Sequence, residues 1–165
     1  MQDVIAKLRA KKDDEGFTLI ELLVVVVIIG VLVAIAVPVY LNYRQGAADK
    51  SAQSDVRGAI SAVEQFYTNN GNAYPATKAD ETGTASKLDL PALTSSGRLA
   101  TITLSDKTKL GYVNSGNGKY KICATNTGGS GKYYLYDSET GGSVKTVEGT
   151  LTLTTCATAT PTTTN

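Results

Sequence analysis

An uncharged, mostly apolar run of 18 residues, from Leu22 to Val39, constrains this chain more than any other feature. A helix rises about 1.5 Å per residue, so a helix of this length spans roughly the hydrocarbon core of a bilayer. The run is rich in Val and Ile, which are poor helix formers in water, but in lipid the backbone must satisfy its own hydrogen bonds. The alternative is a buried strand or core helix of a soluble protein. Because the run is long for a strand and has a charged flank, the sequence predicts a membrane-spanning helix.

The residues before the run are charged. Residues 1–15 contain four basic side chains and end in three acidic ones. A basic flank holds its side of the membrane in the cytoplasm. A secretory signal peptide fits poorly, because its small-residue cleavage site follows the apolar region, whereas here the conspicuous small residue, Gly16, precedes it. A cut after Gly16 would remove the charges and keep the apolar segment.

Three residues depart from the apolar pattern. Gly30 weakens a helix in its middle, and Pro38 removes one backbone hydrogen bond near its end. We therefore expect the helix to be straightest before Gly30 and most easily stretched between Gly30 and Pro38. Glu21 places a carboxylate near the start of the apolar segment, where it costs a few kcal/mol in hydrocarbon unless it finds a partner or snorkels to the interface.

The string GFTLIELLV at residues 16–24, with the charged leader before it and Pro38 behind it, resembles the N-terminal signature of type IV pilins and related pseudopilins. The resemblance extends over roughly residues 7–70. It implies an α+β fold, in which a long N-terminal helix, half transmembrane and half amphipathic, packs on a small antiparallel sheet. It also implies a homopolymer, a helical filament with the apolar helices bundled in its core.

The resemblance further implies a maturation path. A prepilin peptidase would cut between Gly16 and Phe17, and the same enzyme would N-methylate the freed amine of Phe17. The amine stays largely cationic at neutral pH, so it can pair with Glu21 of a neighbouring subunit and fix the axial register. Gly30 and Pro38 belong to the same assembly segment. The pilus assembly machinery in the cytoplasmic membrane would move the single-pass precursor into an extracellular filament.

These arguments divide the chain into five regions. They are a cleaved leader at 1–16, a hydrophobic transmembrane and polymerisation helix at 17–40, an amphipathic helix half at 41–70, an exported globular domain at 71–156, and a disordered Thr-rich tail at 157–165.

The amphipathic half of the helix should lie on a sheet. Apolar residues recur there at spacings of three and four, as they do on one face of a helix. They are Val56, Ala59, Ile60, Val63, Phe66 and Tyr67. Asn69 to Asn72 supply residues that tolerate positive φ and should end the helix.

The C-terminal half reads as a loop followed by strands. Residues 71–99 are polar and predict a long connection, with a short helical turn near Leu88 to Leu93. Alternating apolar residues and Gly-rich turns then predict an antiparallel meander. Its strands are 100–104, 110–113, 119–125 and 132–137, with weaker candidates at 144–147 and 151–155.

The two cysteines, Cys123 and Cys156, are too far apart in sequence for a CxxC motif or a zinc knuckle. An even count in a translocated domain favours one disulfide, whereas a cytosolic domain would hold two unrelated buried thiols. A disulfide-bounded C-terminal region is also common in type IV pilins. Such a bond would be worth roughly 3–4 kcal/mol.

The composition argues against an enzyme. The chain has no histidine, no nucleophile beside a plausible base, and a net charge of +1. No metal or cofactor site is predicted. The loop Gly128 to Lys132 faintly resembles a phosphate loop but lacks its first Gly and its Ser or Thr, so a hairpin turn is favoured.

Three functions compete. The first is a structural pilin, acting in adhesion or motility. The second is the major pseudopilin of a type II secretion system, although such subunits are typically cysteine-free and carry a calcium site. The third is a competence pilin that binds nucleic acid, supported only by the Lys and Tyr residues of the strands.

Overall fold

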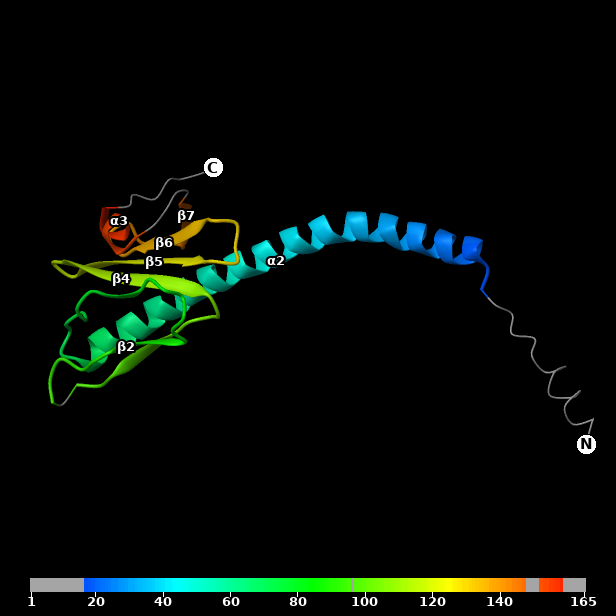
Figure 1. Ribbon diagram of the computed structural model, residues 1–165. Coiled ribbons are helices and arrows are strands. Elements are labelled where there is room, and N and C mark those ends of the chain that lie inside the picture. Colours follow the sequence, from blue (N-terminus) through cyan, green and yellow to red (C-terminus); the bar gives the residue numbers. More distant parts are fainter. Residues whose placement is uncertain (1–16, 96, 148–151, 159–165) are drawn as a thin grey trace, which may run out of the picture. The chain divides into compact units, whose positions relative to one another are not determined.

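The computed structural model describes residues 17–95, 97–147 and 152–158. The chain divides into two units at Tyr40, one of residues 1–40 and one of residues 41–165, and each is described by itself. One helix, α2, is continuous from Leu19 to Asn69 and supplies both units (Figure 1). This confirms the predicted long helix, and Pro38 lies inside it without ending it.

The second unit contains the sheet. Five antiparallel strands follow the order β1 (Lys78–Asp80), β4 (Thr108–Gly116), β5 (Lys119–Asn126), β6 (Tyr133–Asp137) and β7 (Lys145–Val147). β2 (Lys87–Leu90) and β3 (Ala100–Thr103) form a separate two-stranded sheet. A short helix, α3 (Leu153–Thr158), follows β7. The fold is α+β, as expected.

The core lies between the second half of α2 and the inner face of the sheets. Val56, Val63 and Phe66 are fully buried there, and Ile60 packs at the margin, as their helical spacing predicts. The sheets contribute the facing apolar side chains, which include Leu90, Ile102, Leu110, Tyr112, Tyr120 and Ile122. The helix ends where Gly71 and Asn72 take positive φ values of 68° and 60°.

The β4–β5 hairpin turns at Asn117 and Gly118, whose φ values of 51° and 73° are those a type I′ turn requires. Gly116, at φ 75°, sits beside the irregularity in the β4–β5 register. One of the predicted Gly-rich turns is therefore confirmed, at Gly116-Asn117-Gly118.

Four predictions about the second unit are wrong in part. The region 71–99 is not one loop with a helical turn, because it contains β1 and β2. β2 is only four residues long, too short for its alternation of exposed and buried side chains to stand out. Residues 100–103 do form a strand, but they pair with β2 and not with the meander.

The C-terminal segment differs as well. The alternating residues around 151–155 predicted a strand, but α3 begins at Leu153. The helix is set by a local cap, since Thr155 N donates to Thr152 Oγ1 at 3.2 Å and Cys156 N donates to Thr152 O at 2.9 Å. Ala157 and Thr158, assigned to a disordered tail, belong to α3. Residues 159–165 lie outside the described residues, as does Leu151.

Candidate assembly site

The start of α2 is capped by its own first turn. Thr18 N and Thr18 Oγ1 each donate to Glu21 Oε2 at 2.8 Å, and Glu21 N donates back to Thr18 Oγ1 at 3.3 Å. This is a capping box, in which two residues satisfy each other's polar groups at a helix N-terminus. Glu21 therefore has a local role that its place in the apolar run did not suggest. The Thr-x-x-Glu spacing in the sequence was the available signal.

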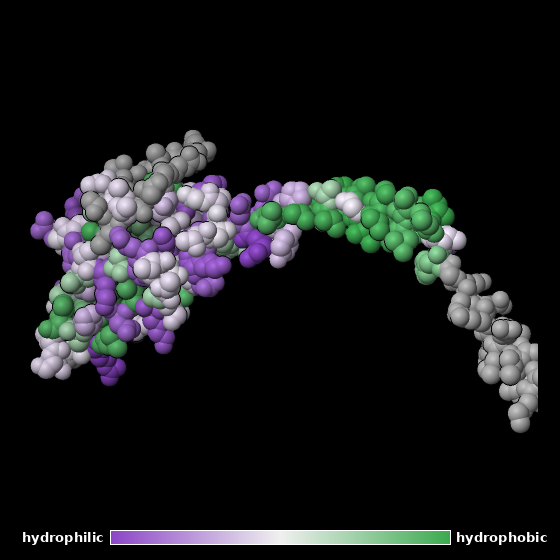
Figure 2. Space-filling model, in the orientation of Figure 1, coloured by the Kyte–Doolittle hydropathy of each residue, from purple (hydrophilic) through white to green (hydrophobic). Residues whose placement is uncertain are grey.

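The first part of α2 leaves its apolar side chains uncovered. Figure 2 shows them as a continuous apolar surface that ends where polar side chains begin. Among the described residues, α2 is the one helix long and apolar enough to cross a membrane, and none of its apolar window is buried. Exposed side chains of this segment include Leu22, Val26, Ile29, Leu32, Ile35 and Val39. Such a surface is stable only in lipid or against other apolar helices.

All of the predicted processing and assembly residues except Gly16 are among the described residues. Gly16 lies outside the described residues, and Phe17 is the first described one, with 79% of its surface exposed. Gly30 lies on the helix surface, where a Cβ would meet nothing within 4 Å. Gly30 and Pro38 both have helical backbone, so stretching between them remains a prediction.

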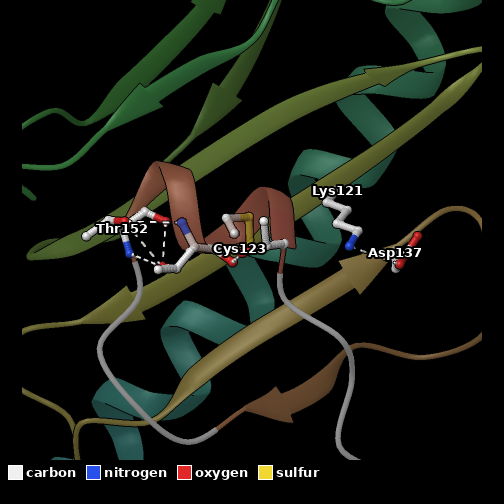
Figure 3. The surroundings of a disulfide bond; sticks show 7 residues. Lys121, Cys123, Asp137 and Thr152 are labelled. Atoms are coloured by element: carbon white, nitrogen blue, oxygen red, sulfur yellow. Dashed lines mark hydrogen bonds and ion pairs between the residues drawn. A yellow bond between two sulfur atoms is a disulfide. The ribbon is translucent and has the colours of Figure 1, made fainter.

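Cys123 on β5 and Cys156 on α3 form a disulfide, with their Cα atoms 6.0 Å apart (Figure 3). Both cysteines are buried in a small cluster with Val113 and Leu135 on the outer sheet face, opposite the α2 core. The bond holds α3 against β5 and so ties the C-terminal segment to the sheet.

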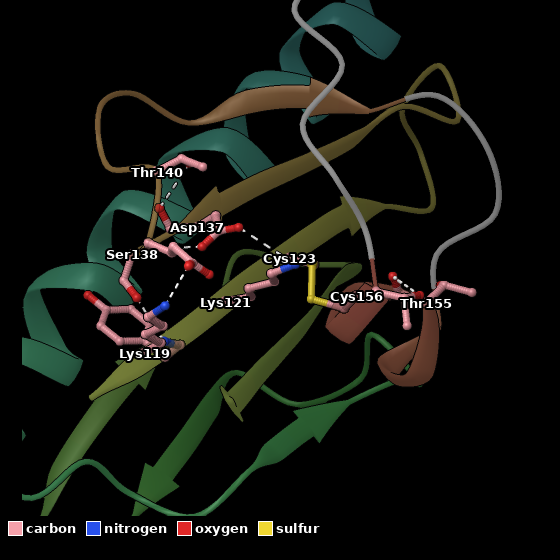
Figure 4. A network of polar contacts seen from close by, with 11 residues as sticks. Lys119, Lys121, Cys123, Asp137, Ser138, Thr140, Thr155 and Cys156 are labelled. Atoms are coloured by element: carbon pink, nitrogen blue, oxygen red, sulfur yellow. Dashed lines mark hydrogen bonds and ion pairs between the residues drawn. A yellow bond between two sulfur atoms is a disulfide. The ribbon is translucent and has the colours of Figure 1, made fainter. Parts of the chain in front are cut away.

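Two of the strand lysines proposed for nucleic-acid binding are paired with carboxylates. Lys119 pairs with Glu139, and Lys121 Nζ lies 3.6 Å from Asp137 Oδ2 (Figure 4). The Lys121 side chain is also mostly covered. These two pairs lower the net charge that β5 offers to a phosphate backbone, which weakens the case for nucleic-acid binding through Lys119 and Lys121.

A carboxylate of α2 binds the glycine-rich loop that follows β5. Asp49 of α2 accepts hydrogen bonds from Ser130 N at 3.0 Å and from Ser130 Oγ at 2.6 Å. This carboxylate lies where a phosphate would have to lie if the loop bound one. The loop therefore joins the sheet to α2, in agreement with the prediction that it is a turn and not a phosphate loop.

Asp55 repeats this arrangement at the next loop. It accepts hydrogen bonds from Ser105 N at 2.8 Å and from Ser105 Oγ at 2.9 Å. The sequence did not predict either contact, because Asp49 and Asp55 lie off the apolar stripe of the helix, yet both are buried. No local pattern marks a carboxylate whose partner lies 50 or 81 residues away.

Four tyrosine rings pack together near the C-terminal end of α2. Tyr120 packs against Tyr74, Tyr112 and Tyr136 with ring centroids 5.0–5.8 Å apart, and its hydroxyl donates to Glu64 Oε1 at 2.6 Å. Burial, above all, raises the pKa of Tyr112 and of Tyr120 well above the ordinary tyrosine value, and for Tyr120 the hydrogen bond to Glu64 adds to the shift. These tyrosines are core, not a base-stacking surface.

Comparison with known proteins identifies the N-terminal segment. Residues 11–37 match the family described as the prokaryotic N-terminal methylation motif. The chain is 40% identical over 76 residues to a fimbrial protein of Neisseria meningitidis, covering 46% of this chain and 44% of the relative. It is 44% identical over 57 residues to the type IV major pilin protein PilE1 of Neisseria gonorrhoeae, covering 34% of each.

A secretion protein is about equally similar. The type II secretion system core protein G of Pseudomonas aeruginosa is 40% identical over 68 residues, covering 41% of this chain and 47% of the relative. The chain thus spans less than half the length of each of these relatives, and no solved structure matches it. Over part of its length the chain is similar to type IV pilins and to a type II secretion core protein, and it bears the prokaryotic N-terminal methylation motif.

Proposed function

We propose that this chain is a pilin, the structural subunit of a type IV pilus filament. The observation that carries the proposal is the uncovered apolar segment of α2, headed by Glu21 within the N-terminal methylation motif. A segment of this kind serves first as a membrane anchor and then as a filament core, because in both places apolar surface is removed from water. The similarity to fimbrial and major pilin proteins supports the same function.

The proposed maturation involves Gly16 and Phe17. A prepilin peptidase cuts between them and methylates the new amine of Phe17, leaving the subunit to begin at that residue. The precursor is a single-pass protein of the cytoplasmic membrane, with the basic leader on the cytoplasmic side. The pilus assembly machinery then transfers it to an extracellular filament. The role is structural and requires no enzymatic activity or cofactor of the chain.

Glu21 can serve both as a cap and as an assembly contact. The two hydrogen bonds that it accepts from Thr18 go to Oε2, and an ionised carboxylate has acceptor capacity on both oxygens. Oε1 can therefore accept a hydrogen bond from the Phe17 amine of a neighbouring subunit. In the low dielectric of a helix bundle, this pair neutralises two buried charges. It also fixes the axial register of neighbouring helices, whose apolar surfaces alone would allow them to slide past one another.

The direct test is electron microscopy of filaments sheared from cells, with mass spectrometry of the subunit. We expect thin filaments whose subunit begins with N-methylated Phe17. A Glu21→Ala variant should still insert into the membrane but yield few or no filaments. A processed chain that forms no filaments, or a Glu21→Ala variant with normal filament yield, would contradict the proposal.

A second candidate is the major pseudopilin of a type II secretion system. The observation that favours it is the similarity to core protein G. Deleting the gene distinguishes the two functions. Loss of surface filaments with normal protein secretion supports the pilin, whereas loss of secretion with normal surface filaments supports the pseudopilin.

A further inference from the structure

A groove of about 520 Å³ runs between the first turns of α2 in the second unit and two loops of the sheet. On the helix side it is lined by Leu41, Arg44 and Ala48, and on the loop side by Asp106, Lys107 and Gly128. We call it the Arg44–Lys107 groove. Its charged lining side chains are two cations and one anion, and Leu41 adds an apolar wall.

The loop that carries Lys107 is held in place by its neighbours. Ser105 is fastened to Asp55 through its N–H and its hydroxyl, and the carbonyl of Asp106 accepts a hydrogen bond from Asn126 Nδ2 at 2.8 Å. The carbonyl of Lys107 accepts one from Thr127 N at 3.1 Å. Lys107 itself has a φ of 62°, a backbone conformation that a residue with a Cβ adopts at a cost. The backbone that carries this cation is therefore fixed by tertiary contacts.

The groove lies at a defined place along the helix. The uncharged run ends at Val39, Leu41 follows two residues later, and Arg44 lies five residues beyond the end of the run. At about 1.5 Å per residue, Arg44 is about 7–8 Å past the hydrocarbon, which is the depth of the head-group layer. Tyr40 and Tyr43, on the same turns, are residues typical of that interface.

We propose that the Arg44–Lys107 groove binds the phosphate of a membrane phospholipid head group, with a preference for anionic lipid. Arg44 and Lys107 attract the phosphate from opposite walls, and Leu41 contacts the glycerol and upper acyl region. Asp106 limits the affinity, which lets the lipid leave when the subunit is transferred to a filament. This inference rests on the proposed membrane insertion of the precursor, but not on its polymerisation.

The test uses the full chain in nanodiscs that contain phosphatidylglycerol and phosphatidylcholine in equal amounts. Native mass spectrometry then counts the lipids that stay bound to the protein. We expect preferential retention of phosphatidylglycerol, falling about fivefold for each cation removed in Arg44→Gln and Lys107→Gln. Asp106→Asn should shift retention in the opposite direction. Lys87→Gln is the matched control, because Lys87 is an exposed cation on β2 outside the groove.

Several outcomes would overturn the inference. Equal retention in wild type and in the Arg44→Gln/Lys107→Gln double variant would do so, as would an equal loss in Lys87→Gln. Displacement of the lipid by millimolar inorganic phosphate would assign the groove to a free anion. Retention that depends on protein density and not on lipid charge would assign it to a second copy of the chain. If the chain does not enter nanodiscs at all, the proposed membrane step itself fails, which separates the two proposals.

Discussion

Asp49 and Ser130 are 81 residues apart in sequence, yet both oxygens of the Asp49 carboxylate accept hydrogen bonds from Ser130. The contact binds the glycine-rich loop to α2, and it leaves no room beside Gly129. A Cβ on Gly129 would overlap Asp49 Oδ1. Close approach of the helix, and not backbone conformation, therefore requires a glycine at this position.

Gly129→Ala should destabilise the second unit by about 1–3 kcal/mol, because the new methyl group must displace the Asp49 carboxylate from its hydrogen bonds. Gly128→Ala is the matched control, since a Cβ there makes only ordinary contacts of 3.4 Å or more. Thermal unfolding of the full chain in detergent micelles measures both. Equal melting temperatures for the two variants would show that Asp49 does not constrain Gly129.

Thr18→Ala separates the capping role of Glu21 from its proposed assembly role. The substitution removes the threonine hydroxyl from the capping box but leaves the Glu21 carboxylate in place. We expect filament yield to fall modestly in Thr18→Ala and nearly completely in Glu21→Ala, measured by quantifying sheared filaments. Equal losses in the two variants would mean that Glu21 acts only as a cap.

Tyr120→Phe should lower the free energy of unfolding by about 1.5–3 kcal/mol, because it removes a short hydrogen bond to the charged Glu64. Tyr74→Phe should cost less, since the Tyr74 hydroxyl lies 3.3 and 3.5 Å from the two Glu64 oxygens in an exposed setting. Denaturant unfolding of the full chain in micelles tests the order. A larger loss for Tyr74→Phe would contradict it.

Alkaline pH should destabilise the second unit through the same tyrosines. The pKa values of Tyr112 and Tyr120 are raised in the folded state, chiefly by burial, whereas in the unfolded chain they titrate near 10. Above that pH the folded state holds more protons than the unfolded state, so stability is complete below pH 10 and falls as pH rises further. Unfolding followed between pH 8 and 11 should show a shallower fall for Tyr120→Phe than for wild type. An identical fall in both would exclude Tyr120 as a source of the dependence.

The disulfide should stabilise the domain and hold α3 in particular. Reduction, or the Cys123→Ala/Cys156→Ala double variant, should lower stability by roughly 3–4 kcal/mol, since the bond closes a segment with a sequence separation of 33 residues. Hydrogen exchange should accelerate in α3 before it does in β4 and β5. An unchanged melting curve under reductant would count against this role.

Prediction from the sequence succeeded where a periodic pattern is long or where a turn has a strong local signal. The buried positions Val56, Val63 and Phe66 followed from helical spacing, and the β4–β5 turn followed from Asn117-Gly118. It failed where an element is short. β2 shows only two buried positions, and α3 depends on a cap between Thr152 and Thr155 within a sequence that alternates like a strand.

The sequence by itself determined the long helix, its apolar uncharged half, the capping spacing of Thr18 and Glu21, and the motif at residues 11–37, because each is encoded in neighbouring residues. Only the tertiary structure decided that residues 100–103 pair with β2 and that Asp49 and Asp55 turn inward to two serines. It also brought Lys107 and Arg44 to the lining of one groove. These contacts join residues 10 to 81 positions apart, and their energies depend on burial and geometry that arise only once α2 packs on the sheet.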